Sequence, residues 1–343
     1  MAKQLPVSCF SWGLQRITLR HRISQLGNHD VSPNVRRAAS TVPICSDGVD
    51  LDEFRRTAFI PGSPLLIRGS LPLPAVRTWF DHHEDQHIGS LSRHITDFAS
   101  CIFPYELVIQ QAAGQISPYS RFQGWLRGQH PELSHLLPDA PDLGREAPNR
   151  HSTFHQLHAP LLLLMKAIEY NESQGNTDCR IKQLYIAQSQ LNELPQALQD
   201  DLPAPELVRQ AGKGDVYDSS IWLGLEPTYT PLHRDPNPNL FLQMLSAKTV
   251  RLLPPNRGQR LYAQVQKGLG AMGNSRFRGS EMMQGPERTA LYEAVWGPGA
   301  TEDILEAKLQ AGDLLFIPKG WWHSVLSAFD DGRLNASANW WFR

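Results

Sequence analysis

His233 and Asp235 are the two residues whose types and spacing point most directly to chemistry. In an extended strand, alternate side chains point to the same face, so residues two apart can reach one point. A helix would place the two side chains about 200° apart, and Pro231 and Pro236 favour an extended segment around the pair. We therefore expect His233 and Asp235 to be ligands of one metal ion.

A third candidate ligand, His323, lies near the end of the chain in the sequence AGDLLFIPKGWWHSV at residues 311–325. Gly312 predicts a turn, Pro318 predicts a bend, and the apolar residues 314–317 between them predict a buried strand. Two imidazoles and one carboxylate with open coordination positions form the ligand set of non-haem Fe(II) oxygenases. Catalytic zinc accepts the same ligand types, so the ligands alone leave the metal undecided.

Lys248 decides between these metals in favour of iron. The apolar run at residues 240–245 is followed by Ser246 and Ala247, which we expect to turn a hairpin, and then by Lys248 at the start of a strand. A lysine beside an iron triad offers a fixed cation to the far carboxylate of a dicarboxylic co-substrate. The combination therefore favours iron with a co-substrate of this kind.

Together, these motifs resemble the JmjC (cupin-like) 2-oxoglutarate oxygenases, nearest to small hydroxylases such as factor-inhibiting HIF and the JmjC arginyl hydroxylases. The matching motifs span somewhat under half of the chain and stand in the order typical of the family. They are YIAQSQL at residues 185–191, TPLHRDPNPN at 230–239, Lys248, GDLLFIPKGWWH at 312–323 and NWWF at 339–342.

The resemblance implies a fold and a set of site residues. The fold is a double-stranded β-helix, the jelly-roll cupin core, in a mainly β chain with helical elaboration (α+β). Fe(II) would be held by His233, Asp235 and His323, with 2-oxoglutarate and O2 as co-substrates and Lys248 at the far carboxylate. Further contacts to the co-substrate or its surroundings would come from Tyr185, Thr230, Asn239, Asn339 and Trp340. Tyr185 and Trp340 also fit simple strand packing and core packing, respectively.

The resemblance further implies hydroxylation of a protein or peptide side chain, with the cofactors carrying the hard chemistry. Two other classes stay open. A JmjC lysine demethylase applies the same iron chemistry to an N-methyl group, although nothing resembling a chromatin-reader module or a Cys/His zinc finger accompanies these motifs. A non-catalytic cupin-like binding protein is the other class, and the intact triad with Lys248 argues against it.

Composition narrows the expected partners and compartment. The 343 residues are 41% hydrophobic, contain no apolar run of membrane-spanning length, and include four scattered cysteines without a CxxC pair. Residues 41–343 hold 27 basic and 33 acidic side chains, which suits a basic protein partner better than nucleic acid. We expect no nucleic-acid or membrane partner. We also expect a monomer, because the sequence ends directly after residues 339–342 without the helical tail by which some relatives dimerise.

The chain is expected to divide into three parts. Residues 1–40 hold six Lys/Arg and one acidic residue, with apolar residues at helical spacing, which is typical of a mitochondrial targeting segment. The alternative is a disordered basic tail or nuclear signal, and hence a nuclear or cytoplasmic protein. Residues 41–180 are expected to form a mostly helical elaboration. Residues 181–343 would form the catalytic core, with an insertion at residues 256–303 that suits a lid or substrate rim.

Two histidine groups outside the motifs are interpreted as surface residues. The first is the run at residues 81–87, expected to be a solvated helix end. The second lies within residues 104–175, expected to be mostly helical, and shares helical spacing: His151, His155 and His158. Local patterns also predict strands at residues 64–68, 185–191 and 220–225, and helices at 49–59, 74–80 and 161–168.

Overall fold

The computed structural model describes residues 40–343 except 47, 70–72, 82–88, 112–115, 141–150, 271–282 and 301–302. The described residues belong to one compact unit, Ala38–Arg343. Almost all of the expected targeting segment and most of the histidine run at residues 81–87 therefore lie outside the described residues. Within the described part, every helix is too short or too polar to cross a membrane.

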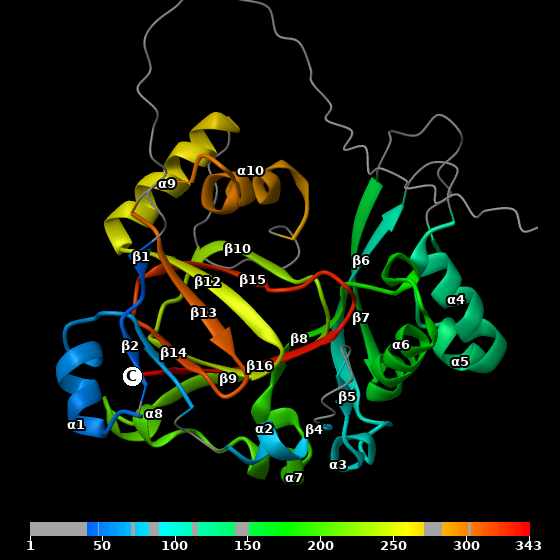
Figure 1. Cartoon of the computed structure of the whole chain (residues 1–343), viewed down its shortest axis with the longest axis horizontal. Coiled ribbons are helices and arrows are strands. Elements are labelled where there is room, and N and C mark those ends of the chain that lie inside the picture. Colours follow the sequence, from blue (N-terminus) through cyan, green and yellow to red (C-terminus); the bar gives the residue numbers. More distant parts are fainter. Residues whose placement is uncertain are drawn as a thin grey trace, which may run out of the picture. The chain divides into compact units, whose positions relative to one another are not determined.

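Two β-sheets form the centre of this unit (Figure 1). The smaller sheet has the order β1 (Ser40–Thr41), β13 (Leu305–Gln310), β12 (Ala247–Leu253), β15 (Trp322–Ser327), β10 (Tyr229–Arg234). The larger sheet has the order β2 (Ile44–Cys45), β3 (Leu65–Ile67), β14 (Leu314–Ile317), β11 (Asn239–Leu245), β16 (Leu334–Phe342), β9 (Val216–Leu225), β8 (Leu184–Gln190), β6 (Ile102–Gln111), β7 (His151–Pro160). A short pair, β4 (Phe80–Asp81) and β5 (Ser90–Leu91), stands apart.

Buried side chains from both sheets meet in one cluster, which includes Val250 of β12, Phe241 of β11 and Leu315 of β14. This face-to-face burial of apolar side chains is the interaction expected of a β-sandwich. Together with the helices described below, it confirms the predicted jelly-roll core with helical elaboration.

The connection from β11 to β12 corrects one prediction. Ser246 has a positive φ of 62° and does turn the chain, but β11 belongs to the larger sheet and β12 to the smaller one. The expected hairpin is therefore wrong, because the turn carries the chain from one sheet to the other. This crossing places Lys248 on the smaller sheet, two strands from β10.

The N-terminal part contains more β-structure than predicted. Strands β6 and β7 pair antiparallel along their full lengths, from Ile102 opposite Pro160 to Gln111 opposite His151. The expectation of mostly helical structure over residues 104–175 is therefore wrong for residues 104–111 and 151–160, which are strands. In β6, alternate residues from Phe103 to Ile109 are buried, so its sequence follows the two-residue period of a strand. In β7, His155 and His158 lie an odd number of residues apart and so point to opposite faces.

Other local predictions agree with the structure. The strands expected at residues 64–68, 185–191, 220–225 and 314–317 are β3, β8, β9 and β14. Helix α6 (Leu161–Ser173) begins directly after Pro160, where proline commonly precedes a helix. The helices expected at residues 49–59 and 74–80 are α1 (Leu51–Phe54), continued by a π-helical turn (Arg55–Phe59), and α2 (Pro74–Thr78).

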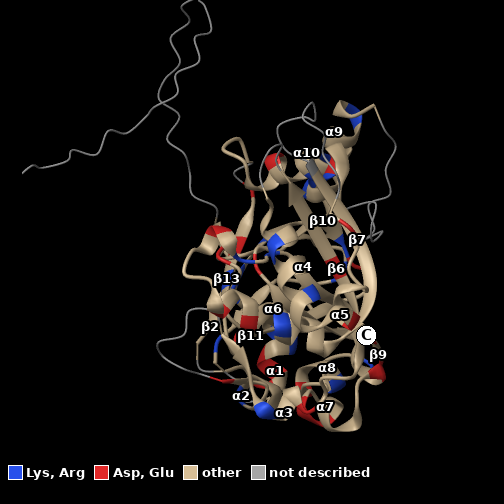
Figure 2. Cartoon of the chain, turned by 90° about the vertical axis from the view of Figure 1, so that its right-hand side faces the viewer, with Lys and Arg blue, Asp and Glu red and all other residues tan. Residues whose placement is uncertain are grey.

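Helices cover the outer face of the larger sheet. A second apolar cluster joins strand residues such as Ile186 and Leu223 to residues of α4 (Pro118–Gln129) and α6. Three short helices lie along the lower part of the molecule in Figures 1 and 2: α3 (Arg93–Thr96), α7 (Gln196–Asp201) and α8 (Glu206–Gln210). Acidic and basic residues are interspersed over these short helices (Figure 2).

The predicted insertion at residues 256–303 contains two helices, α9 (Pro255–Gly268) and α10 (Gly285–Trp296), which lie beside β10 (Figure 1). A third apolar cluster joins Leu261 of α9 and Leu291 of α10 to Leu232 of β10 and Trp322 of β15. The insertion therefore packs directly on the two strands that carry the histidines of interest.

Gly258 tests this packing. A Cβ at Gly258 would lie 2.1 Å from the Cγ of fully buried Trp322, so Gly258→Ala requires α9 or the indole to move. We expect this variant to lose about 1–3 kcal/mol of unfolding free energy, measured by urea denaturation. Gly268→Ala in the same helix is the control, because a Cβ there meets no atom within 4 Å. Equal stability of the two variants would contradict the close approach.

Candidate metal centre

The three predicted ligands converge in space. Strands β10 and β15 are antiparallel, and His233 lies directly opposite His323. The candidate ligand atoms of His233, Asp235 and His323 all lie within 4.8 Å of one another. The Nε2 of His233 is 3.7 Å from Oδ1 of Asp235, and the Nε2 of His323 is 3.6 Å from its Oδ2. The structure therefore brings together the metal triad expected from the sequence.

Asp235 reaches the site by a route that strand geometry alone does not explain. Strand β10 ends at Arg234, so Asp235 lies just beyond it. The carboxylate is held by two hydrogen bonds to its Oδ2, from Trp341 Nε1 at 2.7 Å and Asn239 Nδ2 at 3.1 Å. Asn339 in turn donates to Asn239 at 2.9 Å. These bonds leave Oδ1 as the oxygen best placed for a metal.

Backbone carbonyls orient both imidazoles. His233 Nδ1 is 2.8 Å from the carbonyl oxygen of Pro231, and His323 Nδ1 is 3.4 Å from that of Trp321. Because a carbonyl can only accept, these contacts place the proton on Nδ1 and leave the Nε2 lone pair for a metal. Burial, with the neighbouring His233, lowers the pKa of His323 to about 4, so this ligand is neutral near pH 7.

Asp235 has the opposite electrostatic character. Burial disfavours its charged form, but the two imidazoles and the hydrogen bonds from Trp341 and Asn239 outweigh burial and lower the pKa of its carboxyl group. The site thus presents two imidazole nitrogens and one carboxylate oxygen. This donor set fits Fe(II) with open positions, and it also fits catalytic zinc.

Lys248 is a buried cation at the other end of the same pocket. Its Nζ donates to Tyr185 Oη at 2.9 Å and to Ser337 Oγ at 2.8 Å, and lies 5.5 Å from the ring centroid of Phe241. Burial lowers the pKa of Lys248 to about 7, partly opposed by the charge of Glu226. Among the described residues, none forms an ion pair with Lys248 in the structure. An anion entering the pocket would therefore relieve a large desolvation cost.

One pocket joins the triad to Lys248. The residues predicted from the family resemblance that line it are Tyr185, Thr230, Asn239 and Asn339. Thr230 lies at odd spacing from His233, but the register of β10 shifts between these two residues. That irregularity explains how both side chains reach the same pocket.

Trp340 corrects a prediction. Its side chain is 1% exposed and belongs to the apolar cluster on the far side of the larger sheet. Trp341 lines the pocket instead. Strand parity explains the difference, because Ser337, Asn339 and Trp341 alternate onto one face of β16 whereas Trp340 points to the other. The same parity could have identified Ser337 and Trp341 from the sequence.

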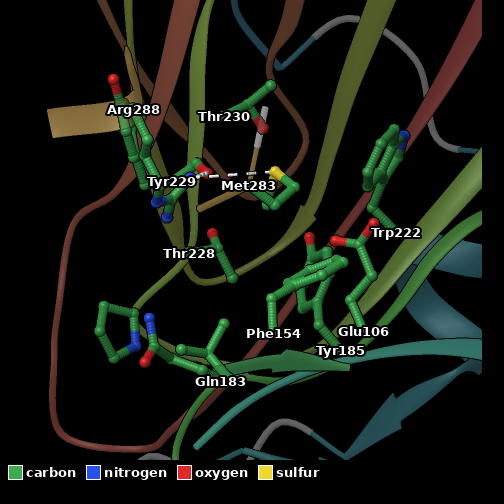
Figure 3. A pocket seen from close by; sticks show the side chains of 12 residues that line it. Glu106, Phe154, Gln183, Tyr185, Trp222, Thr228, Tyr229, Thr230, Met283 and Arg288 are labelled. Atoms are coloured by element: carbon green, nitrogen blue, oxygen red, sulfur yellow. Dashed lines mark hydrogen bonds between the residues drawn. The ribbon is translucent and has the colours of Figure 1, made fainter. Parts of the chain in front are cut away.

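A second pocket adjoins the first and shares Tyr185, Trp222, Thr228 and Thr230 with it. Figure 3 shows its two charged residues on opposite sides, Glu106 from β6 and Arg288 from α10. Burial raises the pKa of the Glu106 carboxyl to about 7. Neither residue was predicted from the sequence, because β6 was expected to be helical and the insertion that contains α10 offered no motif that singled out Arg288.

Comparisons with known proteins support one family. A family model described as a cupin-like domain matches residues 51–343. JmjC domain-containing protein D of Dictyostelium discoideum is 28% identical over 173 residues, 46% of this chain and 36% of that protein. Lysine-specific demethylase 8 of Danio rerio is 30% identical over 161 residues, which are 46% of this chain and 36% of that protein. Lysine-specific demethylase JMJ30 of Arabidopsis thaliana is 27% identical over 152 residues, which are 44% of this chain and 33% of that protein. The matches thus span about a third of each relative.

Trp341 gives a test of the metal centre. Trp341→Phe removes the indole N–H that holds Asp235, and outer hydrogen-bond partners of metal ligands typically change affinity by about 10–100-fold. We expect weaker Mn(II) binding of that order, measured anaerobically by electron paramagnetic resonance. Trp340→Phe, at the neighbouring core position, should leave Mn(II) affinity unchanged. Equal affinities in both variants would show that the indole does not position the carboxylate.

Proposed function

The chain belongs to the cupin-like JmjC family of Fe(II)- and 2-oxoglutarate-dependent oxygenases, and from this premise we propose that it hydroxylates a protein side chain. The observation that carries the proposal is the pocket shared by the His233–Asp235–His323 triad and the buried Lys248. A metal centre alone would suit many proteins. A metal centre with a desolvated lysine in the same pocket suits a metal-chelating dicarboxylate.

The residues of this pocket would have two roles, binding the metal and binding the co-substrate. His233, Asp235 and His323 would hold Fe(II), which with 2-oxoglutarate and O2 supplies the oxidising chemistry when bound. Lys248 binds the far carboxylate of 2-oxoglutarate through a charge-assisted hydrogen bond. Tyr185 and Ser337 hold the Lys248 Nζ in place at 2.9 and 2.8 Å. Phe241 and Val325 are apolar residues in the same pocket as the Lys248 ammonium. They exclude water there, which strengthens the electrostatic contacts of Lys248.

Lysine demethylation is the second candidate. It is favoured by the names of two relatives, lysine-specific demethylase 8 and JMJ30. The same metal centre would serve both reactions, so the products must distinguish them. Hydroxylation leaves a peptide heavier by one oxygen atom, whereas demethylation removes a methyl group and releases formaldehyde. Mass spectrometry of matched methylated and unmethylated peptides separates these outcomes.

His233→Ala tests the metal chemistry. Anaerobic Fe(II) with 2-oxoglutarate should produce a weak visible charge-transfer absorption in the native protein, because the keto acid chelates the metal. The variant loses one imidazole ligand and should show no such band. His155→Ala, whose side chain lies on the face of β7 opposite that of Phe154, should keep it. Tight stoichiometric zinc binding without any band in the native protein would refute the oxygenase proposal.

Lys248→Ala tests the co-substrate site. Loss of one charge-assisted hydrogen bond should cost about 1.5–3 kcal/mol, or roughly ten- to hundredfold in 2-oxoglutarate affinity. Titration of 2-oxoglutarate into the Mn(II)-loaded variant measures this loss, and Mn(II) affinity itself should stay nearly unchanged. Lys308→Ala, at an exposed position on β13, is the control. An unchanged 2-oxoglutarate affinity in Lys248→Ala would remove this residue from the co-substrate site.

A further inference from the structure

We propose that the second pocket binds the target side chain of the substrate and selects a neutral group that both donates and accepts hydrogen bonds. Glu106 would accept from one end of this group and Arg288 would donate to the other. A carboxamide or a neutral imidazole has this chemistry. The inference rests on the proposed function, because it assigns the substrate site of that same metal centre.

The position of the pocket makes it suitable for a substrate. It shares Tyr185, Trp222 and Thr230 with the pocket that contains the triad. A side chain that enters between Glu106 and Arg288 would therefore lie in a pocket next to the metal centre. Phe154 and Tyr229 provide further aromatic walls (Figure 3). Such walls suit the flat faces of an amide or an imidazole.

Glu106 supplies an acid that becomes a full carboxylate only above its pKa of about 7, because burial outweighs the stabilising effects of the Gln156 hydrogen bond and the Arg288 charge. Gln156, directly opposite on β7, hydrogen-bonds the side chain. In the described part of the chain, Glu106 forms no ion pair. A carboxylate in such a setting retains acceptor capacity that an N–H donor from a ligand can use.

Arg288 supplies a guanidinium held in place by neutral groups. Its Nη1 donates to the carbonyl oxygen of Tyr229 at 3.1 Å, and the guanidinium carbon lies 4.5 Å from the centroid of the Tyr229 ring. Tyr292 of α10 contacts the same ring edge to face, with centroids 5.2 Å apart. Across the residues that the structure describes, Arg288 forms no ion pair either. The insertion thus holds a cation at a fixed place on the pocket wall.

The two charges together define the ligand. An ammonium or guanidinium group would gain from Glu106 but would meet the like charge of Arg288. A carboxylate would gain from Arg288 but would meet Glu106. Like charges in a desolvated pocket repel strongly, and a buried charge left without a partner is costly. A neutral group with a hydrogen-bond donor and an acceptor can donate to Glu106 and accept from Arg288 without adding a charge.

The peptide preference of the native protein is the first test of the proposal. Peptide binding is compared at pH 8, above the pKa of Glu106, with protein loaded anaerobically with Mn(II) and 2-oxoglutarate. Six pools of capped peptides have randomised flanks and a fixed central Gln, Asn, His, Lys, Arg or Glu. The native protein should prefer the Gln, Asn or His pools by about tenfold, the value of one charge-assisted hydrogen bond. The pool with the highest affinity distinguishes carboxamide from imidazole.

Each charged wall can be neutralised separately. Arg288→Gln leaves Glu106 alone and should shift the preference to the Lys and Arg pools. Glu106→Gln leaves Arg288 alone and should shift it to the Glu pool. The controls are Arg260→Gln on α9 and Glu206→Gln on α8, both at exposed positions, and these should keep the native preference. Opposite shifts in the two pocket variants would be difficult to produce by misfolding.

Two results would overturn the proposal. One is a native preference for the Lys or Arg pool that Arg288→Gln does not change, which would assign a basic side chain to the pocket. The other is an unchanged preference in both pocket variants, which would place the target side chain elsewhere. Mn(II) and 2-oxoglutarate binding are measured in the same samples. If the native protein binds neither Mn(II) nor 2-oxoglutarate, the proposed function itself is refuted.

Discussion

The antiparallel pairing of β10 with β15 is the constraint on which the site depends, because it sets His233 directly opposite His323. Cross-strand neighbours are the closest residues that a sheet can bring together from distant parts of a chain. The pairing supplies two ligands but not the third. Asp235 lies beyond the end of β10 and is held by hydrogen bonds from the larger sheet, through Trp341 and Asn239. The metal centre therefore depends on the correct packing of both sheets.

Buried charges without ion-pair partners distinguish this pocket from a structural core. In the described part of the chain, Lys248 is buried and Glu106 and Arg288 are half-buried, and none of the three forms an ion pair. Each costs stability in the free protein, because its desolvation is only partly offset by neutral hydrogen bonds and ring faces. A core selected for stability alone would replace such groups. Their arrangement around one metal centre is instead what the binding of polar ligands requires.

The parts outside the metal strands contribute the charged residues of the second pocket. Strand β6 from the N-terminal elaboration carries Glu106, and α10 from the insertion carries Arg288. Both elements pack on the core through apolar clusters, so their charged residues are held by the fold. Variation in these two elements would change the lining of the second pocket while leaving the triad and Lys248 intact.

The metal triad and the strands that carry it were predictable from the sequence, because ligand types, two-residue spacing and Pro/Gly turns are local signals. Lys248, Tyr185, Thr230, Asn239 and Asn339, which line the pocket of the triad, followed from motif resemblance. Strand parity would also have favoured Trp341 over Trp340. Only the tertiary structure decided that β11 and β12 lie in different sheets and that Glu106 faces Arg288. The reason is physical: a turn has the same local conformation whichever sheet the chain enters next. Likewise, residues from distant segments become neighbours only through packing, which no local pattern encodes.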